Sequence, residues 1–509
     1  MRDWQTWTRV GVIAMLVAVT GGPGTAPLPA RAEIPPHLGY GINVRFQSHV
    51  VPLFEPLGFE WLKLWEEYET EQNPTLPETR YPYQVLFLID CTQKSGDLDA
   101  WGDAVEAIAE AGRGLIEAYE ICNEPNRAGW LNKDVHPPTP PDPGLYVQML
   151  QRAYERIKAV DPAATIVSAG LAPVGRIEGT CHGWDGNDCG AMDEREYARQ
   201  MFLLGAGNYF DAFGYHPYGF AYAPEIGYES VSNGFAFRGI EVMHDLLEQH
   251  GLGHKPVWAT EFNWLRDPSE DGAIPDWCHR KPAYEDNFGW MDVPEVQQAN
   301  YITRAFQYAD ENWPWMGAMF VWNLDWHDYG WLCDPARYFS VLKVDYTDYD
   351  PEDPPPAPYT TTLAYDALAE MEKHPGHFGP RLAVVPPVLA FLADVDEPGI
   401  HAGVVVPLNT GYRVFTWTAT VAVGMQATGT GTLGVQVTPT LAITTGLQGT
   451  PLTVTVDSTG YTTGTFTGAI TVTATTTGVL DAPQRVPVTL LVVPEVYRVY
   501  LPVALRSAP

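Results

Sequence analysis

Short apolar segments alternate with longer amphipathic ones through most of the sequence, and this order constrains the fold more than any other feature. The strand-like segments are residues 39–45, 60–65, 84–90, 119–124, 165–169, 212–216, 256–261 and 316–322. Helix-like patterns follow the last six of them, at residues 98–111, 145–160, 194–204, 238–250, 294–311 and 361–373. Apolar strands that alternate with helices are typical of a parallel sheet covered on both faces. Eight such strands predict an α/β fold, a (β/α)8 TIM barrel, over residues 33–374.

Two of these strands end in a glutamate. The fourth reads Tyr-Glu-Ile-Cys-Asn-Glu-Pro-Asn from residue 119, and it has to end at Pro125 because proline has no N–H to donate to a sheet. Glu124 therefore lies at the carboxyl edge of its strand, and Glu261 ends the seventh strand in the same way. An isolated Asn-Glu-Pro can also be an ordinary surface turn. Because catalytic groups lie at this end of such barrels, we expect the two carboxylates to face each other across the mouth.

Two carboxyl groups that flank one bond are what glycoside hydrolysis requires. One must carry a proton at the working pH, and the other must be ionised. A separation of about 5–5.5 Å predicts a retaining enzyme with a covalent intermediate. In that scheme Glu124 is the general acid and then the general base, and Glu261 is the nucleophile. The scheme needs no cofactor and no metal.

Two other classes of function stay open on the sequence alone. A non-catalytic glycan-binding barrel would share the fold and the aromatic residues but would have lost a carboxylate, whereas both glutamates are present here. A metal-dependent hydrolase needs clustered His and Asp ligands at strand ends. The first strand contains no His-x-His, and the strand ends carry mostly amide, carboxylate and aromatic groups.

The barrel segment resembles the clan A glycoside hydrolases, and its Asn-Glu-Pro-Asn sequence is similar to families 5 and 39. The resemblance is carried by Asn123-Glu124-Pro125, His216-Pro217-Tyr218, Thr260-Glu261 and Trp322. It implies that Asn123 binds the 2-hydroxyl of the sugar and that Trp322 stacks beneath it. It also implies that His216 and Tyr218 orient the nucleophile and hold substrate. Members of the clan often carry an arginine beside the nucleophile, a place for which Arg45 is the candidate.

The same side chains also have structural readings. His216 could be a hydrogen-bonded histidine of the core, and Tyr218 and Trp322 could be packing residues. Aromatic residues often fill cores without touching a ligand. Trp65 and Trp130 are candidate sugar platforms at the rim of the barrel.

Alternation along the fourth strand would put Glu120, Cys122 and Glu124 on one face. Glu120 would then lie deeper in the barrel than Glu124. A buried charge at that depth needs a partner, which Lys63 or Arg45 could supply. We therefore interpret Glu120 as a structural residue.

The formal net charge of −32 argues against nucleic-acid and anionic-membrane partners, and it leaves a carbohydrate substrate open. Residues 1–32 are typical of a signal peptide, with a basic start, an apolar run too short to span a bilayer and the small-x-small site Ala30-Arg31-Ala32. We expect a secreted or cell-surface protein with no transmembrane span.

An exported chain can keep disulfides, and this one has six cysteines. Cys91 and Cys122 end neighbouring strands and either pair or remain buried thiols. None of the six has the CxxC spacing of a zinc site. The other expected pairs are Cys181 with Cys189, and Cys278 with Cys333.

The composition changes after the barrel. Residues 375–387 are expected to be a linker, and charged residues then give way to Thr, Val and Gly over residues 388–495. Alternating β-branched residues between turn signals predict an all-β, immunoglobulin-like sandwich. Residues 452–476 resemble the BACON-like modules of secreted bacterial glycosidases, which implies either spacing or attachment to a glycan or cell surface. Residues 496–509 are expected to be a short tail.

Overall fold

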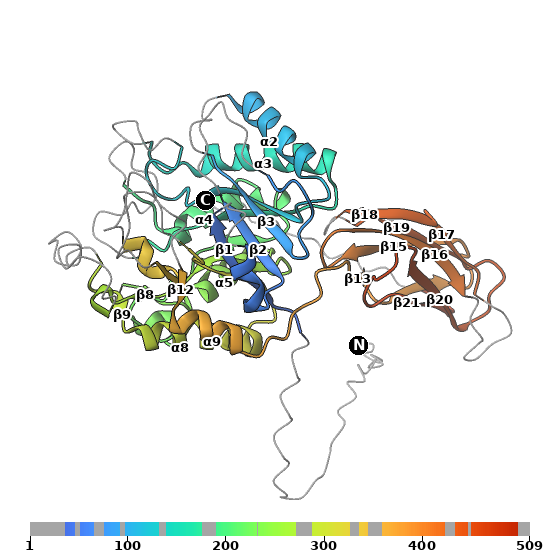
Figure 1. Cartoon of the computed structure of the whole chain (residues 1–509). Helices are drawn as coiled ribbons and strands as arrows, with labels where there is room; N and C mark the ends of the chain where they lie inside the picture. Colours follow the sequence, from blue (N-terminus) through green and yellow to red (C-terminus); the bar gives the residue numbers. More distant parts are fainter. Residues whose placement is uncertain are drawn as a thin grey trace, which may run out of the picture.

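The computed structural model describes residues 36–45, 51–65, 76–91, 97–131, 139–175, 190–231, 233–270, 288–325, 335–344, 359–422, 433–445 and 449–496. Its first body is an eight-stranded parallel sheet with the order β5-β4-β3-β2-β1-β10-β7-β6 (Figure 1). Bridges from Val167 to Ala212 and from Leu171 to Tyr215 bring β5 alongside β6. The sheet is thus a nearly closed, TIM-like barrel, which confirms this part of the predicted fold.

The elements of the barrel follow the predicted order. Its strands are β1 (Gly39–Arg45), β2 (Trp61–Trp65), β3 (Gln84–Ile89), β4 (Ala118–Asn123), β5 (Thr165–Gly170), β6 (Phe213–Tyr215), β7 (Val257–Phe262) and β10 (Met316–Val321). The helices around it are α1 (Val51–Phe54), α2 (Leu98–Gly112), α3 (Pro143–Val160), α4 (Glu194–Leu203), α5 (Gly239–Gln249), α8 (Glu295–Asn312) and α9 (Leu363–Glu370). Short strands β8 (Leu265–Arg266), β9 (Asp292–Val293), β11 (Leu342–Val344) and β12 (Tyr359–Thr361) lie in the loops after β7 and β10.

Side-chain caps fix the starts of several helices. Asp97, Asp142 and Asp193 accept hydrogen bonds from backbone N–H groups in the first turns of α2, α3 and α4. Thr362 does the same for α9. Such caps satisfy donors that have no partner within a helix, and α3 also has Pro143 at its first position. Local sequence therefore helps to determine where these four helices begin after their loops.

The barrel interior changes from apolar to polar along the strands. Trp61 and Trp258, near the amino ends of β2 and β7, pack with Phe320 of β10. Gly41 leaves room for this layer, because a Cβ there would lie 2.5 Å from the ring of Phe320. Two residues beyond Trp61 on β2, Lys63 is fully buried. The carboxyl ends of the strands thus carry buried charge above an aromatic floor.

The second body contains two β-sheets. One is antiparallel in the order β13-β15-β19-β17, and the other has the order β14-β21-β20-β16-β18, with β14 and β21 parallel. The strands are β13 (Leu382–Val385), β14 (Leu389–Asp394), β15 (Ile400–Asn409), β16 (Val414–Ala422), β17 (Val435–Thr438), β18 (Leu441–Thr445), β19 (Leu452–Asp457), β20 (Gly464–Ala474) and β21 (Gln484–Val493). They have a core of their own that includes Trp417 and Phe466.

The first strand of these sheets, β13, lies inside the range 375–387 that the sequence analysis assigns to a linker. The sheets therefore begin before residue 388. The immunoglobulin-like topology and the likeness to BACON modules stay predictions.

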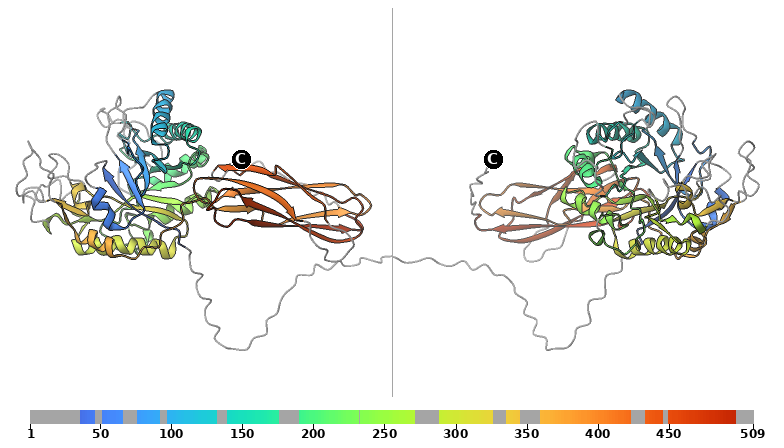
Figure 2. Two further views of the ribbon diagram at one scale, coloured as in Figure 1. Left: turned by 45° about the vertical axis from the view of Figure 1, so that its right-hand side comes forward. Right: turned by 90° about the vertical axis from the view of Figure 1, so that its left-hand side faces the viewer.

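The two bodies meet at the amino ends of the barrel strands (Figure 2). Trp258 Nε1 donates a hydrogen bond of 3.1 Å to Tyr412 Oη. The ring of Phe378 lies 5.1 Å from that of Trp61 and 5.0 Å from that of Tyr412, measured between centroids. Aromatic packing thus continues from the barrel floor into the second body.

Among the residues that the structure describes, no helix combines the length and the apolar character that crossing a membrane requires.

Candidate active site

Glu124 directly follows β4, in a backbone conformation that few side chains adopt. The φ angle is 44° at Glu124 and 66° at Cys122, both in the left-handed region. Regular alternation therefore stops after Ile121. The expectation that Cys122 shares a face with Glu120 and Glu124 is wrong, because Cys122 packs with Ile121 in the main core. Non-glycine residues held in this region concentrate at functional sites.

A disulfide joins Cys122 to Cys91 at the ends of β4 and β3. The sequence left open whether these two cysteines pair, and the structure pairs them two residues before Glu124. The other four cysteines lie outside the described residues.

A hydrogen-bonded turn fixes the loop after Glu124. Glu124 N donates to Gly170 O over 3.1 Å, and Arg127 N donates to Glu124 O over 3.0 Å. Asn126 is fully buried, and its side-chain amide binds both the N–H and the carbonyl of Ala172. The Asn-Glu-Pro-Asn sequence therefore specifies the geometry of the turn as well as the carboxylate.

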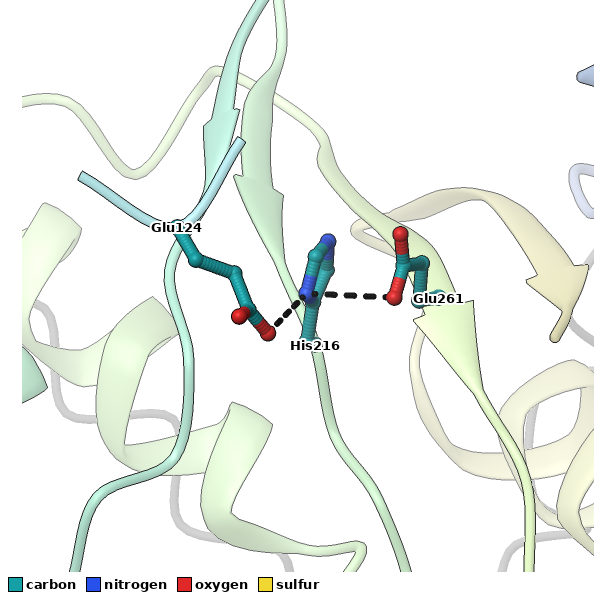
Figure 3. A group of neighbouring side chains, drawn as sticks. All are labelled: Glu124, His216 and Glu261. Carbon is teal, nitrogen blue, oxygen red and sulfur yellow. Dashed lines mark hydrogen bonds and ion pairs between the residues drawn. The ribbon is translucent and has the colours of Figure 1, made fainter. Parts of the chain in front are cut away.

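His216, which follows β6, lies between the two glutamates (Figure 3). Its Nδ1 is 3.0 Å from Glu124 Oε1 and 3.6 Å from Glu261 Oε2. Tyr218 Oη donates a hydrogen bond of 2.8 Å to Glu261 Oε2. One carboxylate oxygen of Glu124 and one of Glu261 lie within 4.8 Å of each other. The structure thus brings four of the predicted site residues into one cluster.

Gly170 on β5 makes room for His216. A Cβ at Gly170 would lie 2.0 Å from His216 Nε2 and 2.5 Å from Thr260 Oγ1, far inside contact distance. The sequence shows a glycine at the end of this strand, but nothing in it indicates that the imidazole passes so close.

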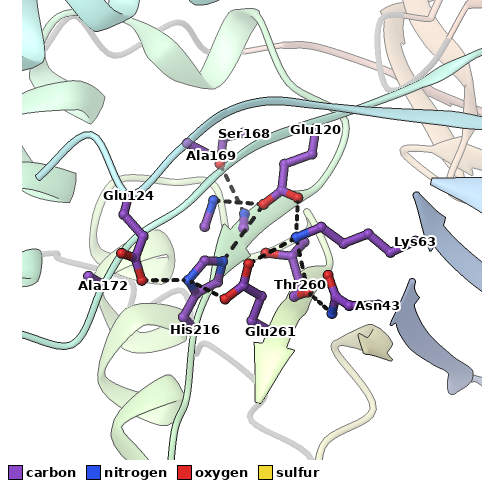
Figure 4. A network of polar contacts seen from close by, with 12 residues as sticks. Asn43, Lys63, Glu120, Glu124, Ser168, Ala169, Ala172, His216, Thr260 and Glu261 are labelled. Carbon is purple, nitrogen blue, oxygen red and sulfur yellow. Dashed lines mark hydrogen bonds and ion pairs between the residues drawn. The ribbon is translucent and has the colours of Figure 1, made fainter. Parts of the chain in front are cut away.

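A buried ion pair lies next to Glu261 (Figure 4). Lys63 Nζ is 2.7 Å from Glu120 Oε2 and 3.4 Å from Glu261 Oε1, and Lys63 and Glu120 are both fully buried. Glu120 also accepts a hydrogen bond from Gly170 N. Lys63 is therefore the partner of Glu120 and at the same time the cation beside Glu261, a second contact that the sequence analysis did not foresee.

The described part of the chain does not include the side chain of Arg45, the arginine expected beside Glu261. The backbone of Arg45 ends β1 and pairs with Trp65 of β2. The role of Arg45 stays a prediction.

Arg127 contacts Glu124 from the solvent side. Its Nη1 lies 2.6 Å from Glu124 Oε2, and its side chain is 61% exposed, against 16% for Glu124. Burial raises the pKa of Glu124, but the Arg127 guanidinium and His216 outweigh it and hold that pKa at about 2. The sequence analysis did not identify Arg127. Its position three residues after Glu124, in a tight turn, could have indicated a contact between the two side chains.

The buried charged groups of the cluster shift one another's pKa values. Burial lowers the pKa of His216, but Glu261, Glu120 and Glu124 together raise it to about 9. Burial raises the pKa of Glu120, while Lys63 and His216 lower it to about 2. His216 thus carries a proton at neutral pH, between carboxylates that stabilise it.

Two tryptophans lie at the strand ends beside the cluster. The rings of Trp65 on β2 and Trp322 after β10 are 5.3 Å apart between centroids. Trp65 is nearly buried, whereas Trp322 is half-buried.

Asn123 Oδ1 is a buried acceptor that has no hydrogen-bond partner among the described residues. Trp130 is nearly buried too, and it packs edge-on against Tyr146 as a core residue.

Glu124, His216 and Glu261 could also hold a metal ion. One donor atom from each lies within 4.8 Å of the others. Two carboxylates and one imidazole are a donor set that divalent cations accept. The proton on His216 opposes this use, because a metal binds the neutral imidazole.

Neither a family model nor a curated protein matches the sequence. Solved structures that resemble it include a β-glucuronidase of Bacteroides uniformis, with 11% identity and a TM-score of 0.38 over 90% of this chain and 46% of that one. This chain thus spans about half the length of the glucuronidase. A glucosidase of Croceicoccus marinus has 9% identity and a TM-score of 0.42 over 84% of this chain and 96% of its own. Xylanase 10B of Thermotoga maritima has 12% identity and a TM-score of 0.36, over 66% and 94% respectively.

Proposed function

We propose that this protein is a retaining glycoside hydrolase that cleaves O-glycosidic bonds of an oligo- or polysaccharide by double displacement. The observation that carries the proposal is the approach of Glu124 and Glu261 to within 4.8 Å at the mouth of the barrel. Retaining enzymes hold their two carboxyl groups about 5–5.5 Å apart, whereas inverting enzymes leave about 6.5–9.5 Å for a water molecule. The observed proximity supports the retaining class.

In this mechanism Glu261 attacks the anomeric carbon while Glu124 gives a proton to the leaving oxygen. The contacts of Glu261 suit a nucleophile, because Tyr218 and Lys63 each hold one of its two oxygens in place. In the second step Glu124 takes a proton from water, which then releases the sugar from Glu261.

Protonation of Glu124 needs a change in its surroundings, because a carboxyl with a pKa of about 2 is ionised at neutral pH. His216 holds a proton 3.0 Å from Glu124 and is the nearest source of it. A sugar that displaces water and moves the exposed Arg127 away would raise the pKa of Glu124 in two ways, by desolvation and by loss of the cation. Substrate binding would thus prepare the acid.

Substrate contacts follow from the groups around the glutamates. Asn123 Oδ1, the buried acceptor described above, is available to a sugar hydroxyl. The half-buried face of Trp322 would carry the sugar ring, with Trp65 behind it. Arg45 is proposed as a further contact.

The test compares Glu261→Ala with Glu124→Ala on an activated aryl glycoside, with azide added. Glu261→Ala should be nearly inactive, and azide attacking from the vacated side should yield a glycosyl azide of inverted configuration. Glu124→Ala should keep its first step, and azide should speed turnover with retained configuration. On poor leaving groups Glu124→Ala should lose about 10²–10⁴-fold. The exposed Glu110→Ala is the matched control.

Proton NMR of the azide products gives the decisive readout. Inverted azide from Glu124→Ala together with retained azide from Glu261→Ala would mean that the two roles are exchanged. Full activity of both variants would reject the proposal.

A non-catalytic glycan-binding barrel is the alternative function. It predicts that a glycan binds in calorimetry and that no product forms from any glycan whose products are followed by mass. Metal-dependent hydrolysis predicts that a chelator abolishes activity. Undiminished turnover in EDTA is expected under the two-glutamate mechanism.

We also propose that the protein is exported, on the basis of residues 1–32, which lie outside the described part of the structure. The mature chain should begin near Glu33, as intact mass can show. Attachment of the C-terminal sheets to a glycan or cell surface is part of the same proposal.

A further inference from the structure

A cavity lies at the other end of the barrel, where the first body meets the second. Its volume is about 470 Å³, and residues of both bodies line it. The barrel contributes chain segments at the amino ends of β1, β5, β7 and β10. The second body contributes the segment around β13 and the turn between β15 and β16. The cavity is therefore separate from the glutamate cluster at the carboxyl ends of the strands.

The charge of this cavity is opposite to that of the chain. Among the described residues that line it are four cations, Lys158, Lys255, Arg381 and Arg413, and three histidines, but one carboxylate, Asp211. The whole chain has 62 acidic residues against 30 lysines and arginines. Positive charge is therefore concentrated around this cavity although the chain as a whole is acidic, and this concentration calls for a physical explanation.

The carboxylate of the cavity is already engaged. Asp211 Oδ2 lies 2.7 Å from Lys158 Nζ and accepts a hydrogen bond from Ile166 N. Lys255 is 8% exposed, and its ammonium donates to the carbonyl of Phe210. Burial and the charge of Lys158 lower the pKa of Lys255 to about 8, against the pull of Asp211. A nearly buried ammonium whose neighbouring carboxylate is shared with a second lysine would be stabilised by an anion.

A buried amide holds both arginine segments. Asn409 Nδ2 donates to Arg413 O over 2.6 Å, and Asn409 Oδ1 accepts from Arg381 N over 3.0 Å. Arg413 itself has a φ of 64°, a conformation that costs free energy for a side chain of its size. Arg413 is exposed, and Arg381 forms a long ion pair of 3.5 Å with Asp481. The two segments thus place Arg381 and Arg413 in the lining of the cavity on a fixed backbone.

We propose that this cavity binds a ligand that carries a phosphate or sulfate group. A guanidinium matches two oxygens of such a group, and an ammonium adds a point charge. The volume lies in the range of sites for small organic molecules, so a sugar that bears the anion fits as well as the free ion does. A ligand held by both bodies would stabilise the folded state and its junction, and increasingly so as the ligand concentration rises above Kd.

The proposal is tested by calorimetry and thermal unfolding of the full chain with inorganic phosphate, inorganic sulfate, glucose 6-phosphate and glucose, each at matched ionic strength. Phosphate and glucose 6-phosphate should bind and raise the unfolding temperature, and glucose should do neither. Tighter binding of glucose 6-phosphate would identify a sugar ester as the ligand class, and equal binding would identify the free anion.

Arg413→Gln should weaken binding about tenfold, because it removes a charge-assisted contact while the exposed position tolerates the change. Arg485→Gln on β21, exposed and outside the cavity, makes the same change of charge and should bind as the wild type does. Arg413→Lys should be intermediate. No binding at about 10 mM, where a millimolar site would be largely occupied, or equal weakening by both Gln variants would overturn the proposal. Neither result depends on glycosidase activity.

Discussion

At the scale of single residues, the neighbours of Glu124 decide whether it can act as an acid. Three cations, Lys63, His216 and Arg127, stand among three carboxylates. Lys63 and His216 are fully buried and fixed by several contacts, whereas Arg127 is largely exposed. Arg127 is thus the cation that a substrate can displace most easily. Replacing Arg127 is also the simplest way to change the pKa of Glu124 without replacing Glu124 itself.

Arg127→Ala should shift the pH dependence of kcat/KM. Removing the guanidinium raises the pKa of Glu124, and an acid works while it is protonated, so the alkaline limb should move to higher pH. Glycosides with a good leaving group should show a smaller shift because they need little protonation. Arg113→Ala, an exposed arginine at the end of α2, should leave the profile unchanged. An alkaline limb that moves to lower pH would contradict this role.

Lys63→Met should destabilise the fold strongly, because it leaves Glu120 charged and buried without its cation. Breaking a buried pair in this way costs about 3–5 kcal/mol, which urea unfolding can measure. Replacing both partners, as Lys63→Met with Glu120→Gln, should recover much of that loss. A double variant no more stable than the single one would show that Lys63 acts through other contacts.

At the scale of elements, the strand order and the closure of the barrel could be predicted from the sequence. The alternation of apolar strands with amphipathic helices is a local signal, and packing between these elements reinforces it. The positions of Glu124 and Glu261 followed from Pro125 and from the end of the seventh strand. The face of Cys122 could not be predicted, because the turn that follows it is held by contacts to another part of the chain, from Glu124 N to Gly170 O and from Asn126 to Ala172. Contacts such as this are set by packing between distant segments.

Gly170→Ala should abolish the proposed glycosidase activity while leaving the barrel folded. The added methyl group would overlap His216 and Thr260, so the imidazole has to leave its place between the glutamates. We expect a large fall in kcat and a moderate loss of stability, within the usual 1–3 kcal/mol of overpacking. Gly434→Ala, at an exposed position where an added Cβ meets nothing within 4 Å, controls for the loss of a glycine. Full activity of Gly170→Ala would mean that His216 has no part in catalysis.

At the scale of the whole molecule, the two bodies share an aromatic junction and a cavity, and the candidate active site lies far from both. A chain shortened to end at His374 should keep its activity on small aryl glycosides, because no described residue of the glutamate cluster comes from beyond it. It should unfold at a lower temperature, because Trp61 and Trp258 lose Phe378 and Tyr412. A chain that ends at Gly379 keeps Phe378 and should lose less. A folded but inactive barrel would show that the second body belongs to the site.

The disulfide between Cys91 and Cys122 gives the candidate enzyme a dependence on the redox poise of its surroundings. The bond fixes the strand end from which Glu124 extends, and Cys122 keeps its positive φ there. A two-electron reduction with uptake of two protons would give two neutral thiols and release that strand end without changing the charge of any side chain. In a compartment rich in glutathione the protein would be made with both thiols free, whereas an oxidising one would close the bond during folding. The redox state of the compartment in which the chain folds would thus affect how firmly the backbone positions Glu124.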